Sequence, residues 1–249
     1  MKKIIVLSTI IFLAKSSFAQ SQIIKKAKIE FERTVNAWAD LRSDFADQIK
    51  KNTPEYSVSY FNFESDGFKA IYKPGKEVAS TSSGGMMFFR SSPASDNIVY
   101  SDYGKKTSIS QKTIFDKTYL IEDSLRHAKW KITNDFREIA GFNCRRATTV
   151  IMDSVFVVAF YTDQISIPGG PESFNELPGM ILGLVINRLH TTWYATKVEV
   201  NSVNDDGIQP PTGKAEKITP TKLTDVLKNL FSGGGGMGNN DKIVWSVLI

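Results

Sequence analysis

The sequence predicts a mainly β protein with two helices, in which a curved antiparallel sheet packs on those helices. Three observations support this fold class. Many short segments alternate apolar and polar residues with a period of two, as half-buried strands do. Tight-turn residues join most of these segments, which favours antiparallel neighbours. Only two segments repeat apolar residues at a helical spacing, and strands do not alternate with helices as in a doubly wound fold.

The expected strands begin at residue 28 and are separated by turns or loops. Asp66-Gly67 is a strong hairpin signal, and residues 80–96 and 201–217 have the composition of loops. Val155–Tyr161 is apolar on both faces, which predicts a central strand. We expect strands at Lys28–Val35, Tyr56–Phe63, Phe68–Tyr72, Asn97–Asp102, Thr107–Gln111, Ile114–Glu122, Trp130–Ile132, Phe136–Ile139, Phe142–Met152, Val155–Tyr161, Met180–Ile186 and Thr191–Val200, with Lys242–Ile249 as a last strand or docking tail.

Two segments change to helical spacing. The first is predicted over Trp38–Lys51 and ends before Pro54. The second begins near Pro220, because proline is favoured in the first turn, and ends at the glycines that start at Gly233. Their apolar stripes are Trp38, Leu41, Phe45 and Ile49 in the first helix, and Leu223, Val226, Leu227 and Leu230 in the second.

The first 19 residues have the pattern of a signal peptide. Lys2 and Lys3 precede an apolar stretch, Ile4–Leu13, and Ser17-Phe18-Ala19 forms a small-x-small cleavage signal. We therefore expect residues 1–19 to be removed, which leaves a single β-rich domain at residues 20–249. Removing three lysines lowers the formal net charge from +5 to +2, which argues against a nucleic-acid partner. The expected location is periplasmic or associated with the cell envelope, with no transmembrane span in the mature chain.

Cys144 is the one cysteine of the chain. A single cysteine excludes an internal disulfide framework and a zinc site built on several thiolates. Cys144 alternates with Phe142 in an expected strand, which favours a buried core position. The alternative is a reactive thiol in a thiol-dependent enzyme, with His127 or His190 as a partner.

The loop at residues 166–179 has the densest turn chemistry of the chain. Its prolines restrict φ and its glycines permit unusual φ values, so we expect one rigid, irregular path. A rigid loop after a buried strand either presents a functional surface or turns the chain between two strands. The candidate ligand- or partner-binding residues of this loop and the following strand are Pro171, Phe174, Leu177, Pro178, Gly179 and Met180.

Several motifs in order resemble the GLPGLI family of exported Bacteroidetes proteins, whose function is uncharacterised. Glu176 and Met180 depart from the motif that names that family. The resemblance implies a role in the envelope, near a TonB-dependent outer-membrane receptor, and the strand-rich pattern is similar to the half-barrel of LolA-like carriers. The motifs are Trp130-Lys131-Ile132, Gly141-Phe142-Asn143-Cys144, Phe160-Tyr161-Thr162, Gly170-Pro171-Glu172-Ser173-Phe174 and Leu177-Pro178-Gly179-Met180-Ile181-Leu182.

Recognisable catalytic motifs are missing from the sequence, including metalloprotease, nucleophile-elbow, P-loop and dinucleotide patterns. We therefore expect a non-catalytic binding module or carrier for a small apolar ligand or an outer-membrane partner, without a cofactor. A second hypothesis is a soft-metal site, because imidazole and thioether groups suit copper. Its candidate ligands are His127, His190, Met86 and Met87.

Overall fold

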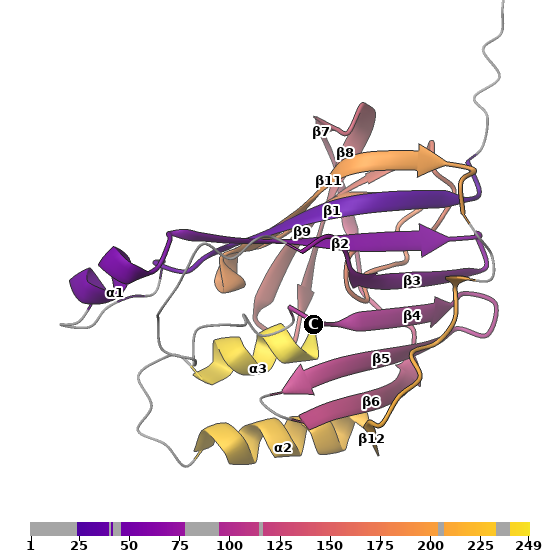
Figure 1. The fold of residues 1–249 in the computed structure, drawn as a ribbon. Coiled ribbons are helices and arrows are strands. Elements are labelled where there is room, and N and C mark those ends of the chain that lie inside the picture. Colours follow the sequence, from indigo (N-terminus) through magenta and orange to yellow (C-terminus); the bar gives the residue numbers. More distant parts are fainter. Residues whose placement is uncertain are drawn as a thin grey trace, which may run out of the picture.

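The computed structural model describes residues 24–39, 41, 46–77, 95–114, 117–203, 207–232 and 240–249. Within these ranges, twelve strands form one open sheet in the order β12-β6-β5-β4-β3-β2-β1-β11-β10-β9-β8-β7 (Figure 1). Neighbours are antiparallel except β12 and β6, which pair in parallel. The strands are β1 (Ala27–Asn36), β2 (Tyr56–Ser65), β3 (Lys69–Pro74), β4 (Ile98–Asp102), β5 (Thr107–Ile114), β6 (Lys117–Ser124), β7 (Lys131–Ile139), β8 (Phe142–Ile151), β9 (Val155–Thr162), β10 (Met180–Ile186), β11 (Thr191–Val200) and β12 (Glu216–Ile218).

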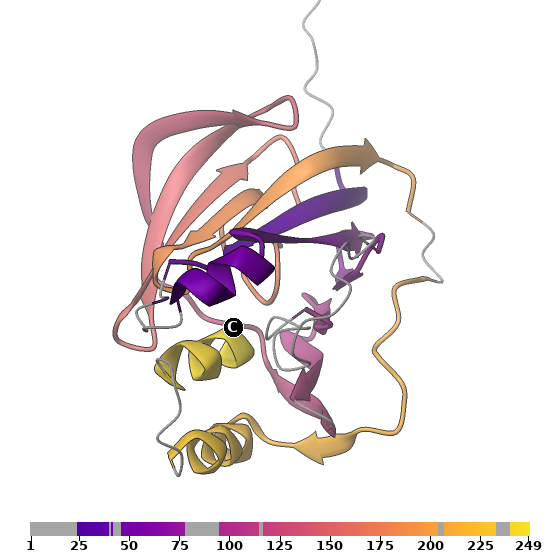
Figure 2. The same cartoon turned by 60° about the vertical axis from the view of Figure 1, so that its left-hand side comes forward.

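The sheet is strongly curved, with β7–β9 and β5–β6 at opposite ends of the curved wall (Figure 2). Two helices, α2 (Pro220–Ser232) and α3 (Asn240–Leu248), lie beside each other near β5 and β6. A shorter helix, α1 (Ala46–Asn52), lies between β1 and β2 in the chain. The predicted mainly β, curved antiparallel architecture is therefore confirmed, with three helices among the described residues where two were expected.

The core lies on the concave side of the sheet, which we call the inner face. In β1, residues Ile29, Phe31 and Arg33 point to this face, because side chains alternate along a strand. In the order of the sheet, the main cluster reaches from β4 to β7, and it includes Ile249, the residue that follows α3. A second cluster packs α2 and α3 on β5 and β6 through Ile114, Tyr119, Ile121, Leu223, Leu227 and Val247.

The predicted helix over Trp38–Lys51 is wrong at its start. Residues 37–39 form a bend and turn, and the described helix begins at Ala46. The Trp38 amide donates a hydrogen bond to the Asn36 side chain, and the Ala37 amide donates to the Glu55 carbonyl. These donors are therefore used by a turn rather than by a helix.

The tail Lys242–Ile249 docks on the protein, but it does so as helix α3 and not as a strand. Its dense apolar run fits either period, and the contacts with α2 and β6 favour the helix. The loop expected at residues 201–217 also runs into an unpredicted strand, because β12 starts at Glu216 and pairs with β6.

The turn at Gly67 confirms the predicted β2–β3 hairpin. Gly67 has a φ of +93°, and a Cβ atom here would lie 2.8 Å from the Lys25 carbonyl oxygen. The predicted signal peptide lies outside the described residues, as does most of the loop at residues 80–96. Among the helices that the structure describes, none is long and apolar enough to span a membrane.

Candidate functional site

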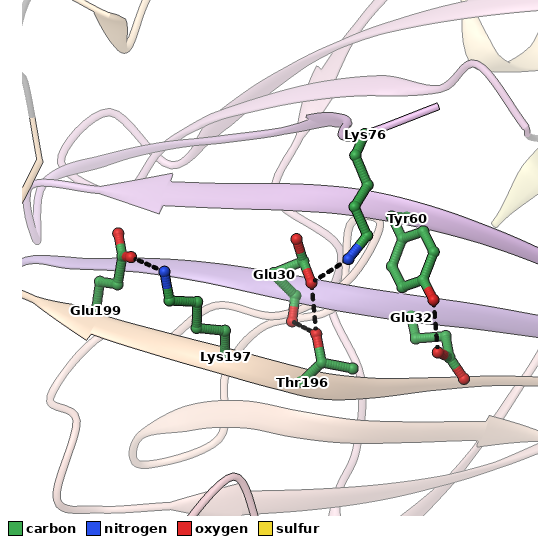
Figure 3. A network of polar contacts seen from close by, with 7 residues as sticks. All are labelled: Glu30, Glu32, Tyr60, Lys76, Thr196, Lys197 and Glu199. Carbon is green, nitrogen blue, oxygen red and sulfur yellow. Dashed lines mark hydrogen bonds and ion pairs between the residues drawn. The ribbon is translucent and has the colours of Figure 1, made fainter. Parts of the chain in front are cut away.

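The outer, convex face of β1, β2 and β11 carries a row of charged and hydroxyl-bearing side chains (Figure 3). Alternation along β1 places Glu30, Glu32 and Thr34 on this face while their neighbours enter the core. Tyr60 of β2 and Tyr194 of β11 are the register partners of Glu32 on either side. The row is therefore a direct consequence of the period-two pattern of β1.

Glu30 is held by two hydrogen bonds. Lys76 Nζ lies 3.0 Å from Glu30 Oε1, and Thr196 Oγ1 donates to the same oxygen at 2.9 Å. The β1–β11 register shifts beside Glu30, and Thr196 sits at this irregularity. The bonds from Lys76 and Thr196 lower the pKa of Glu30. The carboxylate therefore stays ionised near neutral pH and serves as an acceptor.

Glu32 accepts a hydrogen bond of 3.0 Å from the Tyr60 hydroxyl. This bond raises the pKa of Tyr60, because ionisation would place two negative charges side by side. Lys76 Nζ lies 3.9 Å from the centroid of the Tyr60 ring, and Lys197 pairs with Glu199 further along the same face. The row thus places carboxylate acceptors of β1 beside donors from β2, β11 and the segment after β3.

A pocket of about 380 Å³ continues the row at the end of β1. Asn36 and Tyr56 are register partners there, and the Asn36 amide donates to Glu55 at 3.3 Å. The short 3-10 helix η2 (Asn187–Leu189) and His190 provide the opposite side. We call this the outer pocket; its lining residues are Thr34, Asn36, Tyr56, Val185, Asn187, His190, Thr191 and Thr192.

The loop residues predicted to bind a ligand lie mostly in the core. Phe174, Leu177 and Met180 are buried members of the main cluster, Pro171 and Gly179 are also buried, and Pro178 is exposed. These side chains anchor the crossover from β9 to β10, and only Pro178 reaches solvent. Ligand binding by this loop stays a prediction.

In this loop the backbone adopts a positive φ at Glu172, Glu176 and Gly179. Gly179 has a φ of +141°, and a Cβ atom there would lie 2.1 Å from the Thr162 carbonyl oxygen. Glu176 adopts a φ of +71° although it is not glycine. Its Oε2 accepts one hydrogen bond from the Ala128 amide at 3.0 Å, and its Oε1 lies 2.7 Å from His127 Nδ1. These contacts hold Glu176, which departs from the family motif, in a positive-φ conformation.

The predicted soft-metal ligands are not brought together by the described residues. His127 pairs with Glu176, whereas His190 Nε2 lies 3.0 Å from Lys242 Nζ. Met86 and Met87 lie outside the described residues. No cluster of three or more His, Cys, Asp or Glu side chains occurs in the described part of the chain. Copper binding stays a prediction without a site to support it here.

Cys144 is a core residue, as its alternation with Phe142 predicted. It is fully buried in the main cluster. Burial raises the pKa of its thiol to about 12, so the thiolate is scarcely populated near neutral pH. This argues against the alternative of a thiol-dependent enzyme.

Comparison with known protein families now adds to this geometry. Residues 91–218, a little over half of the chain, match the family model described as "N-glycanase peptide, N-terminal domain". The chain belongs to this family. The resemblance to the GLPGLI family is therefore wrong as an assignment, because the matching model is a different one. Its motif Leu177-Pro178-Gly179 reflects the packing of the β9–β10 crossover.

Two solved structures of PNGF-II share the fold of this N-glycanase-type domain. The structure in a C2 crystal form has a TM-score of 0.53 and 14% identity, covering 80% of this chain and 32% of that chain. The structure in a P21 form has a TM-score of 0.51 and 14% identity, covering 81% and 32%. The chain thus spans about a third of the PNGF-II length. None of the curated proteins matches it.

These findings overturn the predicted non-catalytic carrier for an apolar ligand or outer-membrane partner. The matched family and the PNGF-II fold indicate an N-glycanase-type domain instead. The described residues also place large apolar side chains in a filled core, whereas most residues around the outer pocket carry a hydroxyl, amide or imidazole group.

Sequence reasoning missed the outer pocket and the row beside it. The residues come from β1, β2, β10, η2 and β11, which are far apart in the chain. One signal was present in the sequence: the polar members of the β1 alternation include two glutamates on one face. That signal could identify Glu30 and Glu32, but not their partners.

Proposed function

We propose that this chain acts in the processing of N-linked glycoproteins, and that the outer pocket and the adjoining row hold the carbohydrate. The observation that carries the proposal is the family match to an N-glycanase N-terminal domain. The outer pocket supplies the site, because its volume of about 380 Å³ falls within the range of about 300–1,000 Å³ typical of ligand pockets.

The chemistry of the site suits a sugar. Sugar hydroxyls both donate and accept hydrogen bonds, and the pocket offers hydroxyl, amide and imidazole groups. Tyr56 is 53% exposed at the pocket and can place its ring against the apolar face of a pyranose. Glu30 and Glu32 would accept from further hydroxyls along β1, while Lys76 donates. A ligand longer than the pocket would therefore follow the row.

The electrostatics of the row favour holding the glycan over proton transfer. Glu30 has a lowered pKa, so it is a weak base and is not protonated near neutral pH. Tyr60 has a raised pKa and keeps its proton. We therefore assign these groups to orienting the carbohydrate. The predicted export of the chain, and the likeness of its open sheet to a LolA-like half-barrel, stay proposals beside this one.

Calorimetry with a glycopeptide tests the proposal. The probe is a peptide carrying one N-linked glycan, titrated into the full chain beside the same peptide without the glycan. We expect only the glycosylated peptide to bind, and Tyr56→Ala to weaken binding about tenfold, which is about 1.4 kcal/mol. Phe68→Ala is the matched control, because Phe68 is an exposed aromatic residue next to the β2–β3 turn.

Equal binding of both peptides would overturn the proposal, as would unchanged binding in Tyr56→Ala. Glycan release from the glycopeptide is followed in the same samples by mass spectrometry. Release by the wild type that disappears in Glu32→Gln would assign a hydrolytic role to the row and contradict our assignment of orientation alone.

A further inference from the structure

A second pocket lies where β5 and β6 meet α2 and the end of α3. It has a volume of about 350 Å³, and it shares none of its lining residues with the outer pocket. We call it the inner pocket. Ser108, Ser110 and Lys112 line it from β5, while Leu223 of α2 and Val247 of α3 line it from the helices.

Strand β5 places three polar side chains in a row along this pocket. Ser108, Ser110 and Lys112 are two residues apart, so alternation puts them on one face of the strand. Ile114 continues the same face and packs in the cluster that contains α2 and α3. Two hydroxyl groups therefore lead along β5 to one amine.

The amine of Lys112 is held in place inside the fold. Lys112 is only 6% exposed, yet it lines the inner pocket. Its Nζ donates a hydrogen bond of 2.5 Å to the Val247 carbonyl in the last turn of α3. A neutral amine can keep this bond, because one N–H donates to the carbonyl while the nitrogen lone pair stays available. The bond therefore positions Nζ without using its lone pair.

Burial makes the neutral form of Lys112 accessible. Desolvation is the main cause that lowers its pKa from 10.5 to about 8; Arg126 also lowers this pKa, and Glu172 raises it. Compared with a lysine of ordinary pKa, about 300-fold more of the Lys112 amine is neutral at pH 7. A desolvated lysine is the type of residue that forms Schiff bases with carbonyl substrates.

We infer that the inner pocket binds the open-chain aldehyde of a reducing sugar by forming an imine with Lys112. The Nζ lone pair attacks the aldehyde carbon, both amine protons leave with the carbonyl oxygen as water, and a C=N bond forms. The imine then takes up one proton from solvent, and its N–H can donate to the Val247 carbonyl as the amine did. Ser108 and Ser110 lie where the hydroxyl-bearing chain of the sugar would extend. Naming a sugar as the aldehyde rests on the proposed function.

Reductive trapping tests the inference. The full chain is incubated at pH 7 with D-glyceraldehyde, a three-carbon sugar, and with cyanoborohydride, which reduces an imine to a stable amine. Peptide mapping by mass spectrometry then locates the modified lysines. Lys105 is the internal reference, because its side chain is 80% exposed outside the pocket. We expect about tenfold or more label on Lys112 than on Lys105, and Lys112→Arg should lose that label while Lys105 keeps its own.

Propanal separates a sugar site from a site for any aldehyde, because it has the same carbon chain without hydroxyls. We expect the ratio of Lys112 label to Lys105 label to be higher with glyceraldehyde than with propanal, and Ser110→Ala to lower it for glyceraldehyde alone. Labelling of Lys112 no faster than that of Lys105 would overturn the inference, as would equal ratios for the two aldehydes.

The outcomes also distinguish this inference from the proposed function. If Lys112 stays unlabelled while the glycopeptide binds through Tyr56, only the imine site fails. If glyceraldehyde labels Lys112 selectively while the glycopeptide does not bind, the reactive lysine stands and the proposed function fails.

Discussion

Lys112 places an ammonium group inside the fold, where burial lowers its pKa from 10.5 to about 8. Between these two values the unfolded chain binds a proton that the folded chain does not. The Lys112 contribution to the free energy of unfolding therefore rises by about 3 kcal/mol as pH increases from about 8 to 10.5, and it is lost again as pH falls. We expect urea unfolding to show that the free energy of unfolding of the wild type increases with pH, relative to that of Lys112→Met, over this range.

The matched control for Lys112 is Lys105→Met, which removes an exposed lysine near the β4–β5 turn. Its difference from the wild type should stay nearly constant with pH. Tyrosines and other groups titrate in all three proteins and cancel in the comparison. Parallel curves for the wild type and Lys112→Met would show that Lys112 is not buried as the structure places it.

At the same scale, the sequence predicts burial better than it predicts partners. Cys144 was placed in the core by its alternation with Phe142, and the structure confirms this. Arg33 and Glu172 lie far apart in the chain and interact inside the fold. Nothing local in the sequence indicates that contact, because it depends on how the sheet curves.

Helix α2 docks on the protein through one apolar face. Leu227 is fully buried against β6 and α3, whereas Leu230 is 50% exposed one turn further on. Both positions have the same residue type and helical backbone, so helix propensity changes equally in the two alanine variants. We expect Leu227→Ala to cost about 2–5 kcal/mol and Leu230→Ala less than about 1 kcal/mol, measured by urea unfolding. Similar costs for the two would contradict the observed docking of α2.

Strands and helices differ in how far the sequence determines them. The predicted bounds of Met180–Ile186 and Thr191–Val200 coincide with β10 and β11, because these segments have clear turns at both ends. The Trp38 segment has helical spacing, but the Asn36 and Glu55 contacts override it. The α3 segment is apolar enough for either period, so only its packing against α2 and β6 determines its structure.

The whole molecule is organised by one open sheet with two differently used faces. The concave face holds the core, and the convex face carries the outer pocket and the row of charged and hydroxyl-bearing side chains. The architecture could be predicted from the alternation of apolar and polar residues and from the turn residues, because both signals lie within short stretches of sequence. The site did not, because it combines strands whose order in the sheet is β2-β1-β11-β10. The proposed function rests on the family match as well.

Export is a property of the whole chain, and we propose that it proceeds by cleavage after Ala19. Signal peptidase needs a small residue at this position, so Ala19→Arg should leave the 249-residue precursor uncut. Gln22→Arg adds the same charge three residues later and should be processed normally. Intact-mass spectrometry of the envelope fraction measures both, with a wild-type product that starts at Gln20 and has lost Lys2, Lys3 and Lys15. A wild-type protein that retains residues 1–19 after export, or an Ala19→Arg variant cut like the wild type, would contradict the proposal.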